Sequence, residues 1–252
     1  MIRQRTILIS LAIGLLAAAS LPAADAIKAR YITGGGWHDY KALAPVVTDG
    51  ISQHAHVEWD IRFGLDTLAD KKLGEGADVL VYNMCYDEAD PDVLENLLNI
   101  TRSGKPTVLV HCSMHSFRPS DAWTDCCGQR TRKHDAYRGF STTKVDAEHP
   151  IVKSFPDKWT TPGDELYQTI KLADDAHPLL MAEGEEKRES IVCWFHTYGK
   201  GRVFATTLGH DMKTAAQSDY HQLLASGLLW ACDKLADDGQ PREGYAAPKK
   251  TE

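Results

Sequence analysis

The second half of the chain contains the stretch Tyr198-Gly199-Lys200-Gly201-Arg202-Val203-Phe204-Ala205-Thr206-Thr207-Leu208-Gly209-His210-Asp211, which follows the shorter blocks His149-Pro150-Ile151 and Asp164-Glu165-Leu166-Tyr167. The blocks place polar, ionisable side chains at the ends of apolar, strand-like runs. Ligands of α/β folds bind beyond the carboxyl ends of strands, so these blocks predict a functional site as well as a core.

The first half alternates short apolar runs with helix-like segments. We expect strands at residues 29–33, 57–61, 79–82 and 107–110, and helices at residues 40–53 and 91–102. Asp39 and Asp90 are the expected helix caps, and Pro91 suits a first helical turn. This alternation predicts an α/β three-layer sandwich, in which a mostly parallel, flavodoxin-like sheet is covered on both faces and joined by right-handed crossovers.

The second half has a different pattern. Residues 113–137 are polar and without a clear period, which predicts a long functional loop such as a lid or rim. Strand-like runs at residues 167–172, 178–182, 191–196 and 202–207 are separated by turn residues, which favours antiparallel additions at the sheet edge. Residues 217–234 predict a closing helix, and residues 237–252 a disordered tail.

The N-terminus has the pattern of a secretory signal peptide. Arg3 and Arg5 precede an apolar run at residues 7–16, and Ala24-Asp25-Ala26 supplies a small-residue cleavage site. We expect a signal peptide over residues 1–26 and a periplasmic or secreted mature protein, with an uncleaved N-terminal anchor as the alternative. No later segment is long and apolar enough to span a membrane.

The charge and composition restrict the partners. Removal of residues 1–26 takes away two Arg and one Asp, so the formal charge changes from −7 to −8. An acidic protein of this kind is not expected to bind nucleic acid or an anionic membrane. A neutral small molecule such as a carbohydrate is compatible with it, and a homo-oligomer remains open.

Six cysteines in an exported chain permit disulfides. Cys85 and Cys112 each follow a strand-like run, so they are expected to be neighbours across adjacent strands. Cys126 and Cys127 are adjacent in sequence, and the remaining two are expected to be buried thiols. The chain has no CxxC motif, which argues against a zinc ribbon.

Three places supply polar side chains to the predicted carboxyl edge. The first follows residues 34–36, three glycines that carry no phosphate-binding fingerprint, so no nucleotide cofactor is expected. Here Trp37 and His38 are candidate substrate-binding residues, although His38 equally suits a surface loop. The second contains His111 and His115, which are spaced like two metal ligands on one turn, or like a base beside a substrate hydroxyl.

The third place is formed by Glu165 and by His210-Asp211. Glu165 is the best candidate for a general base or carboxylate ligand, because it lies among turn residues before a strand. We expect His111, Glu165 and His210 to be catalytic, and the same three to hold one divalent metal where one binds, as zinc, manganese or iron. Asp211 either binds substrate, orients His210 or caps the helix that follows.

These blocks, in this order, resemble the trehalose-utilisation (ThuA-like) family, from about residue 31 to residue 235. The resemblance implies a fold related to class I glutamine amidotransferases and a single domain over residues 27–236. In those amidotransferases, the turn after the corresponding strand carries a nucleophilic Cys. On this alignment His111 takes its place and Cys112 follows it, so the resemblance implies that the amidotransferase triad is absent. A His-containing motif found in some relatives is replaced here by residues 83–88, where Asp87 or Glu88 is the substitute.

The resemblance also implies a role in carbohydrate metabolism, such as proton abstraction from an oxidised (3-keto) sugar or glycoside. That chemistry needs a base, for which Glu165 is suited, and an electrophile at the developing enolate oxygen, for which His111 and His210 are suited. Aromatic side chains that could stack on a sugar are Trp37, Trp123 and Tyr137. Two alternatives remain: a hydrolase that uses Cys112 as nucleophile, and a non-catalytic sugar-binding or interaction domain.

Overall fold

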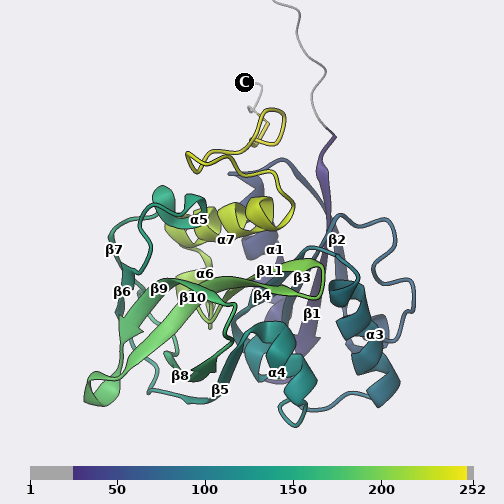
Figure 1. Ribbon diagram of the computed structural model, residues 1–252, viewed down its shortest axis with the longest axis horizontal. Coiled ribbons are helices and arrows are strands. Elements are labelled where there is room, and N and C mark those ends of the chain that lie inside the picture. Colours follow the sequence, from purple (N-terminus) through teal and green to yellow (C-terminus); the bar gives the residue numbers. More distant parts are fainter. Residues whose placement is uncertain (1–24, 249–252) are drawn as a thin grey trace, which may run out of the picture.

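The computed structural model describes residues 25–248. The predicted signal peptide lies outside the described residues, except for its last two positions. β1 begins at Ile27, directly after the expected cleavage site. A nine-stranded sheet runs through the domain in the order β2-β1-β3-β4-β11-β10-β9-β6-β7 (Figure 1).

One half of this sheet is parallel. Its strands are β2 (Val57–Phe63), β1 (Ile27–Gly35), β3 (Val79–Cys85), β4 (Thr107–Val110) and β11 (Gly201–Thr206). The order of the first four is that of flavodoxin-like folds, in which the strand order reverses between β1 and β3. The predicted parallel sheet is therefore confirmed.

The position of β11 corrects one expectation. Residues 202–207 were expected to form an antiparallel edge strand, but β11 pairs in parallel with β4 in the middle of the sheet. Val203, Phe204 and Ala205 are consecutive and fully buried. Such a run is typical of a central strand covered on both faces, where polar and apolar residues do not alternate.

The antiparallel half of the sheet lies beyond β11. It consists of β10 (Glu189–Tyr198), β9 (His177–Glu183), β6 (Ser141–Lys144) and β7 (Lys158–Thr160). β8 (Tyr167–Leu172) is not part of this sheet and pairs with β5 (Gln129–His134) in a separate ribbon. The predicted antiparallel additions are confirmed, with β8 displaced to the ribbon.

Helices cover both faces. One core contains apolar residues of α1 (Tyr40–Ser52), α5 (Pro150–Lys153), α6 (Met212–Ala215) and α7 (Ser218–Ala231). The other contains residues of α2 (Leu65–Leu68), α3 (Pro91–Arg102) and α4 (Asp121–Cys127). Figure 1 shows α1 and α7 on one side of the sheet and α3 and α4 on the other. The remaining helical turns are η1 (His111–His115) and η2 (Glu185–Lys187).

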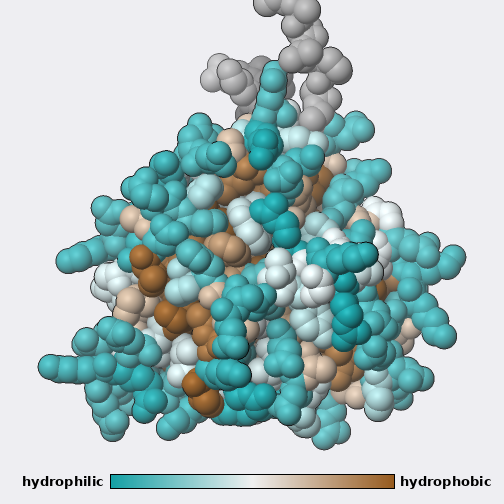
Figure 2. All heavy atoms as spheres, viewed as in Figure 1, coloured by the Kyte–Doolittle hydropathy of each residue, from teal (hydrophilic) through white to brown (hydrophobic). Residues whose placement is uncertain are grey.

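Strand β3 shows why the sheet needs two helical layers. Val79 and Val81 belong to the first core, whereas Leu80 and Tyr82 belong to the second. Successive side chains of a strand point to opposite faces, so an apolar run must be covered on both. On the face seen in Figure 2, hydrophilic residues cover most of the surface. None of the helices within residues 25–248 has the length and apolar character needed to cross a bilayer.

Residues 113–137 are not the irregular loop expected from their polarity. Most of this segment forms η1, α4 and β5. α4 is capped by Ser120, ends at Gly128 in the left-handed conformation, and buries Trp123 and two cysteines. A single seven-residue helix is too short to show a clear period in a polar sequence.

The predicted tail also differs from a disordered segment as far as residue 248. Its backbone folds back onto the domain: Ala246 bridges Ala55, Pro241 bridges Leu235, and the His56 amide donates to the Tyr245 carbonyl oxygen at 2.8 Å. The aromatic ring of Tyr245 packs against the first core. Polar composition therefore does not prevent this segment from pairing with the edge of the domain.

His149 has a structural role as a helix cap. Its side chain caps α5 by accepting a hydrogen bond from the Ile151 amide at 3.3 Å, and its ring stacks on Phe195. Burial lowers the pKa of His149 to about 4, although Asp146 partly opposes this. The neutral imidazole is the form that accepts the capping hydrogen bond.

We therefore predict a pH-dependent contribution of His149 to stability. Because its folded-state pKa lies below the usual value, the contribution is complete above about pH 6.5 and is lost as the pH falls toward 4. We expect a loss of about 1 kcal/mol over this interval, since the side chain is only half-buried. His149→Asn keeps a capping acceptor that does not titrate, so urea unfolding of this variant should lack this part of the pH dependence. Identical pH profiles for the two proteins would contradict the prediction.

Candidate active site

Three histidines meet at the carboxyl edge of the parallel strands. His38 follows β1, His111 follows β4, and His210 follows β11. One ligand atom from each lies within 4.8 Å of the others. The site lies near the point where the strand order reverses, as expected for an open α/β sheet.

His111 occupies a strained turn. Its φ is +46°, a left-handed conformation that is uncommon for a residue other than glycine. Its Nδ1 lies 2.6 Å from the Thr207 carbonyl oxygen, which only accepts, so Nδ1 carries the proton. Nε2 is then an acceptor: the Tyr167 hydroxyl donates to it at 3.3 Å, and a Glu165 carboxylate oxygen lies 3.8 Å away.

The electrostatic surroundings keep His111 neutral. Burial holds its pKa well below the usual value, and the neighbouring His38 and His210 act in the same direction. A neutral imidazole whose Nδ1–H is bonded to a backbone carbonyl is the typical form of a metal-ligating histidine. It is also a form that can accept a proton.

Glu165 and His210 form an ion pair. His210 Nδ1 lies 3.2 Å from Glu165 Oε2, and His134 Nε2 lies 3.5 Å from the other carboxylate oxygen. Burial opposes the charged forms of both partners. Their mutual attraction outweighs it, so the pKa of Glu165 is lowered and that of His210 is raised.

Asp164 joins the two loops that carry this pair. Its fully buried carboxylate accepts hydrogen bonds from the backbone amides of Gly209 at 2.8 Å, His210 at 3.1 Å and Glu165 at 2.9 Å. Burial raises the pKa of Asp164 to about 6, although these hydrogen bonds oppose the shift. Sequence reasoning missed this residue; its only signal is its position beside Glu165 in the quoted block.

His115 does not share a metal centre with His111. It is buried, and its ring stacks on Tyr167 with centroids 4.0 Å apart. Burial lowers its pKa to about 3. η1 is a 3₁₀ turn with about three residues per turn, so side chains four apart do not align as they do on an α-helix.

His38 and His210 line a cleft of about 270 Å³, next to the buried His111. Its lining includes Trp37, which is 67% exposed and available to a ligand, and Tyr167, which separates His111 from His115. Further lining residues that the sequence had not placed in a site are Arg118 and His134, and Asp87 lies there as well.

Two other sequence candidates have structural roles. Trp123 is buried in the second core and donates from Nε1 to the Ser113 carbonyl oxygen, so it cannot stack on a ligand. Asp211 caps α6 by accepting from the Lys213 amide, and its other oxygen accepts from the Tyr137 hydroxyl at 2.7 Å. Tyr137 is 40% exposed and contacts the His210 ring at the edge of the site.

The donor set fits a divalent metal ion. His111 Nε2 is unprotonated, and His210 Nδ1 faces the Glu165 carboxylate at 3.2 Å, where a metal ion would replace the proton of this pair. Together with His38 these imidazoles offer three nitrogen ligands, and the Glu165 carboxylate lies beside two of them. The set differs from the predicted one by including His38, which had been expected to bind substrate. Three nitrogens with an adjacent carboxylate suit zinc, manganese or iron.

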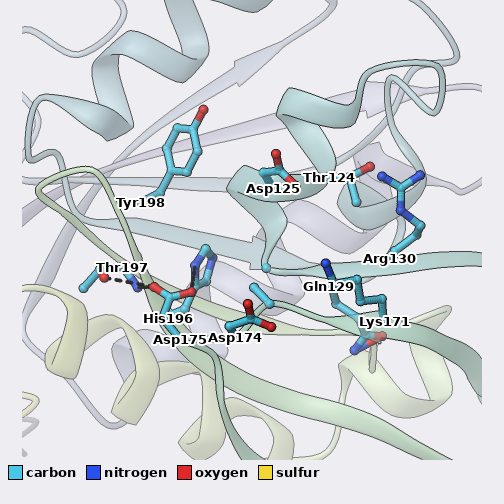
Figure 3. A pocket seen from close by; sticks show the side chains of 12 residues that line it. Thr124, Asp125, Gln129, Arg130, Lys171, Asp174, Asp175, His196, Thr197 and Tyr198 are labelled. Atoms are coloured by element: carbon cyan, nitrogen blue, oxygen red, sulfur yellow. Dashed lines mark hydrogen bonds and ion pairs between the residues drawn. The ribbon is translucent and has the colours of Figure 1, made fainter.

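A second cavity of about 290 Å³ lies between α4, β5 and the end of β10 (Figure 3). It contains acidic and basic side chains, among them Asp125, Arg130 and Lys171. Asp175 is already engaged there by the amide and hydroxyl of Thr197, at 3.3 and 3.1 Å. The histidine cleft is therefore the stronger candidate for an active site.

Solved structures with the same α/β fold include proteins described as ThuA-like. The chain resembles a ThuA-like protein from Parabacteroides merdae ATCC 43184, with 19% identity over 89% of this chain and 98% of that one, and a TM-score of 0.72. It also resembles a ThuA-like protein from Bacteroides uniformis ATCC 8492, with 13% identity over 88% of this chain and 98% of that one, and a TM-score of 0.69. A GMP synthase component from Thermoplasma acidophilum, at 15% identity, is matched over 82% of this chain and 94% of that one with a TM-score of 0.53.

The fold is thus that of the class I glutamine amidotransferase-like proteins, as predicted. Residues 22–231 match the family described as ThuA, trehalose utilisation, and the chain belongs to this family. Membership suggests a role in carbohydrate metabolism. No curated protein matches the sequence.

Replacement of Asp164 should destabilise the protein strongly. In Asp164→Ala three buried amides lose their acceptor, and we expect the free energy of unfolding to fall by about 2–4 kcal/mol. Asp211→Ala, which removes a partly exposed helix cap and the acceptor of the Tyr137 hydroxyl, should cost about 1 kcal/mol. Urea unfolding of both variants measures the difference. Equal losses would mean that Asp164 does not hold the two loops together.

Proposed function

We propose that this chain is an exported carbohydrate-active enzyme that acts on a keto-sugar or glycoside by acid–base chemistry, assisted by one divalent metal ion. The observation that carries the proposal is the cluster of His38, His111 and His210 beside one cleft, with the Glu165 carboxylate next to the last two. Family membership points to the same class of substrate. The signal-like N-terminus, followed at once by β1, supports export.

His38, His111 and His210 are the residues that would hold the metal. A divalent cation bound there would act as a Lewis acid and stabilise negative charge on a substrate oxygen. The Thr207 carbonyl fixes the tautomer and the orientation of His111, and Asp164 fixes the loop of His210 through its backbone. Ligands held in place in this way lose little freedom on binding.

Glu165 is suited to the role of the base. Its pKa is lowered, so it is ionised at neutral pH, and it lies between His210 and His134 at the wall of the cleft. A carbonyl group acidifies the adjacent C–H bond of a keto-sugar, which allows a carboxylate to remove that proton. Trp37 at the rim offers an exposed aromatic face for a sugar ring.

The metal is tested by its content in the purified protein. Isolated without chelator or nickel affinity steps, the full chain should hold about one equivalent of zinc, manganese or iron. His38→Ala should weaken binding of the same ion at least about 10-fold, because it removes one of three nitrogen ligands. His177→Ala, on the surface beside Asp146, is the matched control and should bind normally.

The metal contents of the wild type and the two variants decide whether the centre exists. Loss of metal in His38→Ala but not in the control supports the centre. A wild-type protein that holds no metal after reconstitution with each ion would exclude metal assistance and leave acid–base chemistry at Glu165 alone.

The base is tested by turnover of a 3-keto glycoside. Glu165→Gln should lower kcat at least about 100-fold, because the amide cannot accept the proton, while the three imidazoles still bind metal. Cys112→Ala should keep turnover near that of the wild type. If turnover were lost in Cys112→Ala but kept in Glu165→Gln, the thiol-dependent hydrolase would be favoured. Saturable binding of the sugar without product, with metal supplied, would mark a sugar-binding domain.

A further inference from the structure

Two cysteines lie in contact beside the cleft. Cys85 ends β3, and Cys112 lies in η1 immediately after His111. Their sulfur atoms are 2.6 Å apart, with the Cys112 thiol directed at Cys85, and both side chains are buried against Tyr40. The two thiols are therefore in direct contact.

Thiol–disulfide exchange requires one sulfur that an oxidant can reach and a second sulfur close enough to resolve the mixed disulfide. The contact between the Cys85 and Cys112 sulfur atoms meets the second requirement.

Only one of the two sulfurs has access to the cleft. Cys112 lines the cavity with His38, His115 and Tyr167, whereas Cys85 lies behind it. A small molecule in the cleft would therefore meet Cys112 first. The remaining cysteines, all within the described residues, lie outside the cleft: Cys126, Cys127 and Cys193 are fully buried, and burial raises the pKa of each. Cys232 lies near the far end of the domain, after α7.

We infer that Cys85 and Cys112 form a redox-active pair that closes to an intramolecular disulfide by exchange with a small-molecule disulfide admitted to the cleft. The Cys112 thiolate attacks one sulfur of the oxidant, the other sulfur leaves as a thiolate, and a mixed disulfide forms at Cys112. Cys85 then loses its proton and attacks Cys112, and the second thiolate of the oxidant leaves. Two protein thiols are oxidised to one disulfide, and one small-molecule disulfide is reduced to two thiols.

The cross-link would join the end of β3 to the turn that carries His111. It would also remove the thiol that interacts with His38 and Tyr167. The inference does not depend on the proposed sugar chemistry, because it concerns the redox state of two residues outside the histidine cluster.

The test is exchange of the reduced full chain with oxidised glutathione, followed by alkylation and mass spectrometry under denaturing conditions. We expect the wild type to lose two alkylatable thiols and two hydrogen atoms in mass, without a glutathione adduct. Cleavage after Phe117 separates Cys112 from the Cys126–Cys127 pair, so a peptide linked through Cys85 and Cys112 identifies the bond. The oxidised protein should also melt at a temperature higher by roughly 5–10 °C.

Cys85→Ser is the matched variant. It removes the resolving thiol, so the reaction should stop at a glutathione adduct on Cys112. Replacement of Cys126 and Cys127 by serine should leave the cross-link unchanged. Six alkylatable thiols in the treated wild type, or a bond that joins any other two cysteines, would overturn the inference.

Discussion

The buried carboxylate of Asp164 is the interaction on which the site depends. It accepts amide hydrogen bonds from both the segment before β8 and the loop after β11, which belong to distant parts of the sequence. Taking a carboxylate out of water is unfavourable unless hydrogen bonds replace the lost hydration. Because three amides do so here, the two loops have one joint arrangement, and Glu165 meets His210 as a consequence. The ribbon of β5 and β8 is thereby connected to the carboxyl edge of the parallel strands.

The backbone at His111 determines which side chain faces which partner. The turn after β4 places His111 in the left-handed conformation, and Cys112 follows it. A thiol at that next position points at Cys85 and not at the Thr207 carbonyl, which is taken by His111. The strained turn therefore directs a neutral nitrogen lone pair toward the Tyr167 hydroxyl and the Glu165 carboxylate.

The layer architecture could be predicted from the sequence, since continuous apolar strands, glycine turns and helix caps are local signals. The strand after residue 201 was misplaced because its spacing to β10 is that of a hairpin, whereas burial on both faces makes it central. His111, Glu165 and His210 could be singled out because each follows or precedes a strand. His38 could be placed at this edge of the sheet, but not beside the other two imidazoles. His134 and Asp164 complete the site through contacts across the fold, which no local pattern encodes. Trp123 was misjudged because an aromatic residue in a polar segment gives no sign of which side is buried.

The cleft is less cationic than its number of histidines implies. Burial keeps His111 and His115 neutral, and the positive charge favoured on His210 is balanced by Glu165 beside it. At the proposed metal centre, a proton and a metal ion compete for His210. To bind there, the metal ion must displace the proton that the Glu165 carboxylate stabilises on His210. Metal affinity should accordingly fall as the pH drops, and Glu165, once freed from that proton, would have both carboxylate oxygens available to act as a base.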